Sequence, residues 1–435
     1  MTATPSPSFV TLVRTYGTYA GAMMARGLEL VGKLGLYMLG ARALGVHDSG
    51  YFFLCLTVVG VLATVSRGGF ERAVVRHLAA ELAVGKGRAA GHAFLVGLGA
   101  VLGLGLAVTA LTAAFAQPLA DYVFRDPEAA RPLLLSTLVI LPQAACYFIG
   151  NALLGLHKGA AGQLVQNGLW PVLTLAAVVA GVTSLDGLLY ALAGANVAAT
   201  VVGAVLLFRE RHRFVDTHTD MPPGAPGAAP LPALWRTAAP LSVVEIVQIL
   251  LPSLPVLLLA TFGLPAQVGA FSVANRISML VWVVSTSIGS VAAPSFAARH
   301  RQGQWTELRQ LNRRVRLAVA VFGTPVVAVM VLAPAQVLHL VGPGFEIAAT
   351  ALVILGVGQL VYCLLPCQEI VLAMAGHGSV LRWLTLAQTV VCGALCVLLI
   401  PPFGMIGAAI ATAVFAAQLA IGASLMVRRL MPQAF

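Results

Sequence analysis

The most informative shortage in this 435-residue sequence is charge. Only 9% of its residues are Asp, Glu, Lys or Arg, whereas a typical soluble domain has about 25%. So few polar groups cannot cover a surface that faces water, which excludes a soluble enzyme, a nucleic-acid-binding module and a disordered chain. Hydrophobic residues make up 59% of the sequence and form long unbroken runs, unlike the alternating strands of a membrane barrel. The composition therefore predicts an all-α polytopic membrane protein.

Metal-binding and catalytic motifs are also missing. Of the six cysteines, all in apolar segments, the last four form two pairs at helical i, i+4 spacing. No histidine or carboxylate accompanies them in a ligand pattern, so we expect small buried hydrophobic residues rather than a metal site or disulfides. The sequence contains no Walker loop, HExxH or GxSxG motif. These absences argue against an enzyme, and the sequence predicts no cofactor.

Apolar runs long enough to cross a membrane, which takes about 20 residues, occur twelve times. Polar or proline-rich pieces, such as residues 45–50 and Pro401-Pro402, separate them and stop helices. The predicted spans are residues 16–40, 50–72, 90–116, 131–156, 162–182, 186–208, 236–261, 267–295, 314–334, 347–374, 380–400 and 404–427.

The distribution of basic residues predicts the orientation of these spans. If the N-terminus is cytoplasmic, 19 of the 26 Lys and Arg residues fall in cytoplasmic connections and tails. The external connections then contain only Arg42, Arg125 and Arg131. Because basic residues are retained on the cytoplasmic side, this asymmetry predicts that both termini are cytoplasmic.

The chain divides into two similar halves. Residues 209–233 are rich in Arg, then in Pro, Gly and Ala, and are typical of a cytoplasmic linker. They separate a six-helix lobe at 1–208 from a second one at 234–435. Gly50-Tyr51-Phe52 aligns with Gly269-Ala270-Phe271 at an offset of 219 residues. Two parallel repeats of six spans around a central cavity are an architecture of secondary transporters.

Three ionisable residues lie inside the first predicted span. Arg26, Glu29 and Lys33 fall within roughly 60° of one another on a helix, so they form one polar stripe. Facing lipid, each charge would cost about 2.5–3.5 kcal/mol, so the stripe must face protein or water. An anion-binding cavity wall is favoured over an internally neutralised Arg26–Glu29 pair that fixes packing only.

Other charges within spans have two interpretations each. Arg276, near the middle of the eighth span, can bind a phosphate with its planar guanidinium or pair with Glu245 of the seventh. Glu245 can instead carry a coupling proton or sodium ion. Arg67 and Glu71 are i, i+4 neighbours near an inner end, where a structural role and a functional one are equally plausible.

Several motifs resemble those of a known family. Residues 41–52 (ARALGVHDSGYF) after a polar first helix, and residues 269–277 (GAFSVANRI), resemble the polysaccharide-flippase branch of the multidrug/oligosaccharidyl-lipid/polysaccharide exporter superfamily. The same resemblance extends to two further segments, Leu154-Gly155-Leu156-His157-Lys158 and residues 404–409. The chain departs from the family at Ser66-Arg67-Gly68, where relatives often have an acidic residue before the glycine.

The resemblance implies a twelve-helix flippase of the bacterial cytoplasmic membrane for a polyprenyl-pyrophosphate-linked oligosaccharide. We expect Arg26, Lys33 and Arg276, with Arg67 as a further candidate, to bind the pyrophosphate. Glu29 and Glu245 would orient these cations or take a coupling H+ or Na+. Partners would be the lipid-linked substrate, membrane lipids and polysaccharide polymerase machinery, with no nucleic acid. The alternatives are a cation-coupled multidrug antiporter of the same superfamily and a membrane-embedded glycosyltransferase or polymerase.

Overall fold

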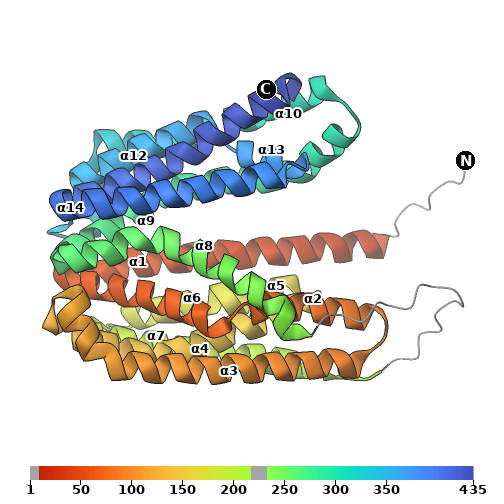
Figure 1. Cartoon of the computed structure of the whole chain (residues 1–435), viewed down its shortest axis with the longest axis horizontal. Helices are drawn as coiled ribbons and strands as arrows, with labels where there is room; N and C mark the ends of the chain where they lie inside the picture. The colour runs from red at the N-terminus through yellow and green to blue at the C-terminus, as the bar shows by residue number, and fades with distance from the viewer. Residues whose placement is uncertain (1–8, 217–232, 435) are drawn as a thin grey trace, which may run out of the picture. The chain divides into compact units, whose positions relative to one another are not determined.

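The computed structural model describes residues 9–216 and 233–434. Its described regular structure is entirely helical, and no strand occurs in these ranges (Figure 1). The α-helices are α1 (Phe9–Arg67), α2 (Phe70–Ala83), α3 (Gly87–Pro118), α4 (Ala130–Gly155), α5 (Gly159–Gln163), α6 (Leu169–Val179), α7 (Leu185–Arg209), α8 (Leu234–Phe262), α9 (Pro265–Arg301), α10 (Trp305–Leu332), α11 (Pro334–Val341), α12 (Ala349–Leu364), α13 (Gln368–Met374) and α14 (Gly378–Leu430).

Nine helices among the described residues are long and apolar enough to cross a membrane. Two of them, α1 with 59 residues and α14 with 53, are interrupted by non-helical backbone. The interruptions lie at Gly45 (φ 77°) and Gly404 (φ 51°), which adopt the positive φ that glycine tolerates without a steric penalty. The protein is therefore a multi-pass, all-α membrane protein, as its composition predicts.

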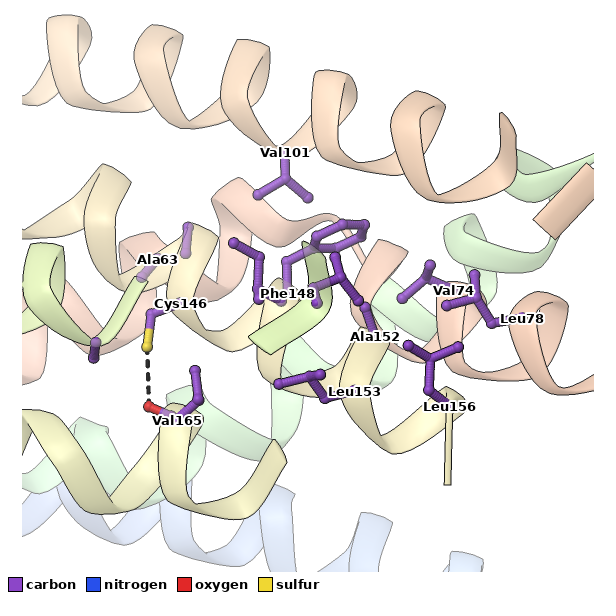
Figure 2. Packing of buried hydrophobic residues seen from close by; sticks show 14 of the residues in the cluster. Ala63, Val74, Leu78, Val101, Cys146, Phe148, Ala152, Leu153, Leu156 and Val165 are labelled. Carbon is purple, nitrogen blue, oxygen red and sulfur yellow. Dashed lines mark hydrogen bonds between the residues drawn. The ribbon is translucent and has the colours of Figure 1, made fainter. Parts of the chain in front are cut away.

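The chain forms two compact units. The first comprises Cys55–Leu250 together with the described residues of Met1–Ala43. In it, α4 packs against α7, α3 and α2. Figure 2 shows the core of this unit, where buried side chains such as Phe148 and Leu153 of α4 and Val101 of α3 meet. The buried thiol of Cys146 donates a 3.1 Å hydrogen bond to the carbonyl of Val165.

The second unit comprises Leu44–Leu54 and Leu251–Phe435. In it, α12 packs against α14, α10 and α9. Gly50 lies so close to the start of α9 that a Cβ there would be 1.9 Å from the Pro265 carbonyl oxygen. A Cβ on Gly269 would likewise be 2.5 Å from the carbonyl oxygen of Val46. The two glycines occupy equivalent positions in the repeat alignment. Both allow the same close approach of backbone between residues 46–50 and the start of α9.

The first residues of the predicted linker are folded onto the first unit. A short 3₁₀ turn, Arg211–Phe214, follows α7. The Arg213 guanidinium donates a 3.1 Å hydrogen bond to the Leu156 carbonyl at the end of α4, and the Phe214 ring stacks on Phe94 of α3. Glu210 accepts from both Lys158 at 3.0 Å and Arg213 at 2.8 Å. We call residues 209–216 the clasp. The Pro- and Gly-rich part of the predicted linker lies outside the described residues.

Candidate functional site

The polar stripe expected on the first span is present on α1 as an ion triad. The Glu29 carboxylate accepts a hydrogen bond from the Arg26 guanidinium at 3.2 Å and another from the Lys33 ammonium at 2.8 Å. Arg26 is the most open of the three, with 68% of its side chain exposed, whereas Glu29 is 15% exposed and Lys33 25%. Two cations share one carboxylate, so the triad keeps an excess positive charge. Its open end is the Arg26 guanidinium.

A short π-helical segment, η3 (Leu164–Gly168), completes the surroundings of the triad. The Gln163 amide, immediately before it, donates a 2.7 Å hydrogen bond to Glu29. Within it, Asn167 Oδ1 accepts from Lys33 at 3.4 Å, and Gln166 donates to Gln163 at 3.2 Å. The wide π turn disrupts the α-helical hydrogen-bond ladder, a feature frequent at functional sites. These amides were not predicted from the sequence, although three side-chain amides within five residues of an apolar span were a visible signal.

Two aromatic residues contact this network, and one of them, Tyr147, links the triad to the Arg67 region. The Tyr147 hydroxyl donates a 2.9 Å hydrogen bond to Asn167 Oδ1. The Arg67 guanidinium lies over the Tyr147 ring, 4.7 Å from its centroid, a cation–π contact. Lys33 Nζ is 5.8 Å from the centroid of Trp170. A continuous polar path therefore runs from Arg26 through Asn167 and Tyr147 to Arg67.

Arg67 itself is held in a buried ion pair. Its Nε donates to Glu71 at 2.9 Å and its Nη2 to Thr64 at 2.8 Å. The two charged side chains are only 9% and 5% exposed. Because removing a charge from water is costly, each of these groups depends on the other. This geometry favours the structural role of the pair among the two roles that the sequence left open.

Glu245 of α8 has a partner other than Arg276, which its sequence position suggested. It forms an ion pair with Arg72 of α2, and Arg72 also donates to Gln248 at 3.4 Å. The side chain of Glu245 is 16% exposed and that of Arg72 is 47% exposed. Glu245 therefore joins α8 to the amphipathic helix α2 within the first unit.

The remaining predicted cation, Arg276, belongs to the second unit. It lies on α9 between buried Asn275 and buried Ile277, and its own residue is partly buried. The structure thus brings Arg26, Glu29, Lys33 and Arg67 into one network in the first unit. Among the described residues, no group of three or more His, Cys, Asp and Glu side chains is arranged to hold a metal ion, and the six cysteines are unpaired and buried.

Comparison with known proteins decides the family. A family model described as polysaccharide biosynthesis protein matches residues 21–300, well over half of the chain. The chain belongs to the polysaccharide biosynthesis protein family. This confirms the resemblance carried by residues 41–52 and 269–277. No curated protein matches the chain.

Solved structures share the fold of this polysaccharide biosynthesis protein. A multidrug resistance MATE family transporter of the MOP superfamily, in an inward-facing conformation, has a TM-score of 0.67 and 18% identity, covering 95% of this chain and 98% of its own. The lipid II flippase MurJ, in an inward closed conformation, has a TM-score of 0.63 and 11% identity, with coverage of 94% and 87%. A MOP superfamily transporter from Pyrococcus furiosus has a TM-score of 0.57 and 19% identity, with coverage of 97% and 95%. At these identities the likeness shows the fold, which is that of membrane transporters and flippases.

Proposed function

We propose that the protein moves a polyprenyl-pyrophosphate-linked oligosaccharide across the bacterial cytoplasmic membrane by alternating access. The observation that carries this proposal is the ion triad on α1, where Arg26 and Lys33 share the single carboxylate of Glu29. A membrane helix that keeps an excess, partly exposed positive charge is suited to an anionic ligand. A pyrophosphate offers several oxygens to the planar fork of an arginine and the point charge of a lysine.

The proposed topology has twelve spans with both termini in the cytoplasm. A 59-residue helix would extend for about 90 Å, three times the hydrocarbon thickness, so α1 must cross as two segments joined at Gly45. The same reasoning divides α14 at Gly404. With these divisions, and with the α5–η3–α6 segment as one more span, the nine candidate helices become twelve. In this proposal the two six-helix lobes are 1–208 and 234–435, joined by the linker 209–233.

Each charged residue has its own role in this proposal. Arg26, Lys33 and Arg276 bind the pyrophosphate, and Glu29 orients the first two. Arg67 supports the site indirectly, because its guanidinium holds the Tyr147 ring in place. Glu245 orients Arg72 and is the candidate for taking a coupling proton or sodium ion, while polymerase machinery consumes the exported product.

Arginine substitutions in cells that depend on this protein for polysaccharide export test the proposal. Arg26→Ala and Arg276→Ala should each reduce export of surface polysaccharide severely, at unchanged levels of inserted protein. Arg88→Ala is the matched control because Arg88 is 83% exposed and lies at the start of α3, outside the network. Normal export in both test variants would refute the pyrophosphate role. If the same variants instead lost the extrusion of cationic dyes, the drug antiporter would replace the flippase.

A further inference from the structure

We propose that the π-helical segment of the first unit forms a subsite for the sugar attached directly to the pyrophosphate. This subsite consists of Gln163, Gln166 and Asn167 with the aromatic residues Tyr147 and Trp170. The inference rests on the proposed function, since it names the part of the lipid-linked substrate that these residues contact.

The subsite is continuous with the cations. Gln163 donates to the carboxylate of Glu29 at 2.7 Å, and Asn167 accepts from Lys33 at 3.4 Å. Lys33 in turn lies over the Trp170 ring. A pyrophosphate held by Arg26 and Lys33 therefore has the amides beside it, on the side that leads to Tyr147. The group that follows a pyrophosphate in such a substrate is its first sugar.

The chemistry of the subsite fits a sugar better than it fits a phosphate or a lipid chain. Side-chain amides donate and accept hydrogen bonds, as sugar hydroxyl groups do. Asn167 accepts two hydrogen bonds through Oδ1, whereas its Nδ2 donates none to any described residue. The buried indole N–H of Trp170 also has no acceptor among the described residues. A buried donor without a partner, such as the Trp170 N–H, is uncommon in native proteins, and the half-buried Asn167 keeps its Nδ2 for a ligand that carries hydroxyl oxygens.

The local backbone provides the arrangement. Helical spacing places residues 163, 166 and 167 on one face. Residues 166 and 167 lie in the π-helical segment, whose turn is one residue longer than that of an α-helix. Tyr147 and Asn151 of α4 hold the segment, because Tyr147 donates to Asn167 and Asn151 donates to Gln166 at 3.0 Å. The amides are thus positioned before any ligand arrives. The competing interpretation is that Asn167 only positions Lys33.

Two binding probes separate these interpretations in the purified full-length protein. One is a polyprenyl pyrophosphate without sugar, and the other is the same lipid with a single hexose. We expect the wild type to bind the hexose-bearing probe about tenfold more tightly, the effect of one or two added hydrogen bonds. In Asn167→Ala this preference should fall to less than about twofold, with little change for the bare lipid. Tyr147→Phe keeps the ring under Arg67 and provides a second, milder variant for the same ratio.

The outcomes are distinguishable from failure of the proposed function. If Asn167→Ala keeps the tenfold preference, the sugar subsite is refuted. Equal losses for both probes would mean that Asn167 only positions Lys33, which also overturns the subsite. Lys33→Gln is the matched control, since it should weaken both probes while leaving their ratio unchanged. If the wild type binds neither probe, the proposed function itself fails.

Discussion

The buried pair of Arg67 and Glu71 gives the sharpest prediction about the structure. Removing the carboxylate in Glu71→Ala leaves the Arg67 guanidinium, with its side chain only 9% exposed, without its ion partner. An uncompensated buried charge of this kind destabilises a protein by about 3–5 kcal/mol. The remaining hydrogen bond to Thr64 and the contact with the Tyr147 ring hold Arg67 in place and so prevent it from escaping to water. We therefore expect Glu71→Ala to be among the least stable single variants of the first unit.

Replacing both members of the pair should recover most of this loss. In Arg67→Leu/Glu71→Leu no charge is left buried, and such exchanges are often neutral or stabilising. The double variant still loses the cation–π contact, worth about 0.5–2 kcal/mol. Its predicted stability therefore lies between that of Glu71→Ala and that of the wild type, closer to the wild type.

Thermal unfolding of the purified variants in one detergent measures this order. The single substitution Arg67→Leu completes the cycle, because it leaves Glu71 buried without a partner and should also be unstable. A double variant no more stable than the singles would refute the argument from charge compensation. Export measured in the double variant then tests the role of the pair, since a stable but inactive protein would show that export requires these charges or the contact of Arg67 with the Tyr147 ring, and a stable, active protein would show that their role is structural only.

Two further predictions concern a close backbone contact and the clasp. Gly50→Ala should lower the unfolding temperature because its Cβ would lie 1.9 Å from the carbonyl oxygen of Pro265. The control Gly60→Ala should leave the unfolding temperature unchanged, since no atom lies within 4 Å of its Cβ. Equal unfolding temperatures for the two variants would contradict the contact. Hydrogen bonding from Lys158 holds the pKa of Glu210 below its ordinary value. The Glu210 carboxylate therefore stabilises the clasp fully above the ordinary pKa of about 4.3. This stabilisation is lost as the pH falls through the lowered pKa of the folded state. The hydrogen-exchange protection of residues 209–216, measured relative to the intrinsic exchange rate at each pH, should therefore fall at acidic pH in the wild type. In Glu210→Gln the protection should be low at every pH, and a fall of the same size in the variant would contradict this role of Glu210.

Much of the helical framework could be predicted from hydropathy alone. The predicted spans 90–116, 131–156 and 186–208 correspond within three residues to α3, α4 and α7. The predicted and observed ends agree closely for these three helices, because an apolar run and a membrane helix both end at residues that tolerate water or form a turn. The prediction 50–72 was too long, since α1 ends at Arg67 and the glycines at 68 and 69 adopt positive φ. Average hydropathy does not detect such a turn, nor the amphipathic helix α2 that follows it.

The site could be predicted only where its residues are close in the chain. Arg26, Glu29 and Lys33 meet because helical periodicity places i, i+3 and i+4 neighbours on one face. Asn167 contacts Lys33 across 134 residues, and Glu245 finds Arg72 in a helix that hydropathy overlooked. No periodicity connects such pairs, since their proximity depends on how helices pack.

The sequence by itself determined that this protein lies in a membrane, where several of its long apolar helices run and that its first span carries an excess of positive charge. These properties follow from local composition, because a bilayer selects apolar runs and expels unpaired charge. Only the tertiary structure decided which charges pair with residues far away in the chain: Glu245 pairs with Arg72, and Lys33 donates to the amide of a π-helical turn. Partner choice depends on distance and burial in three dimensions, which helix packing establishes and no single segment encodes.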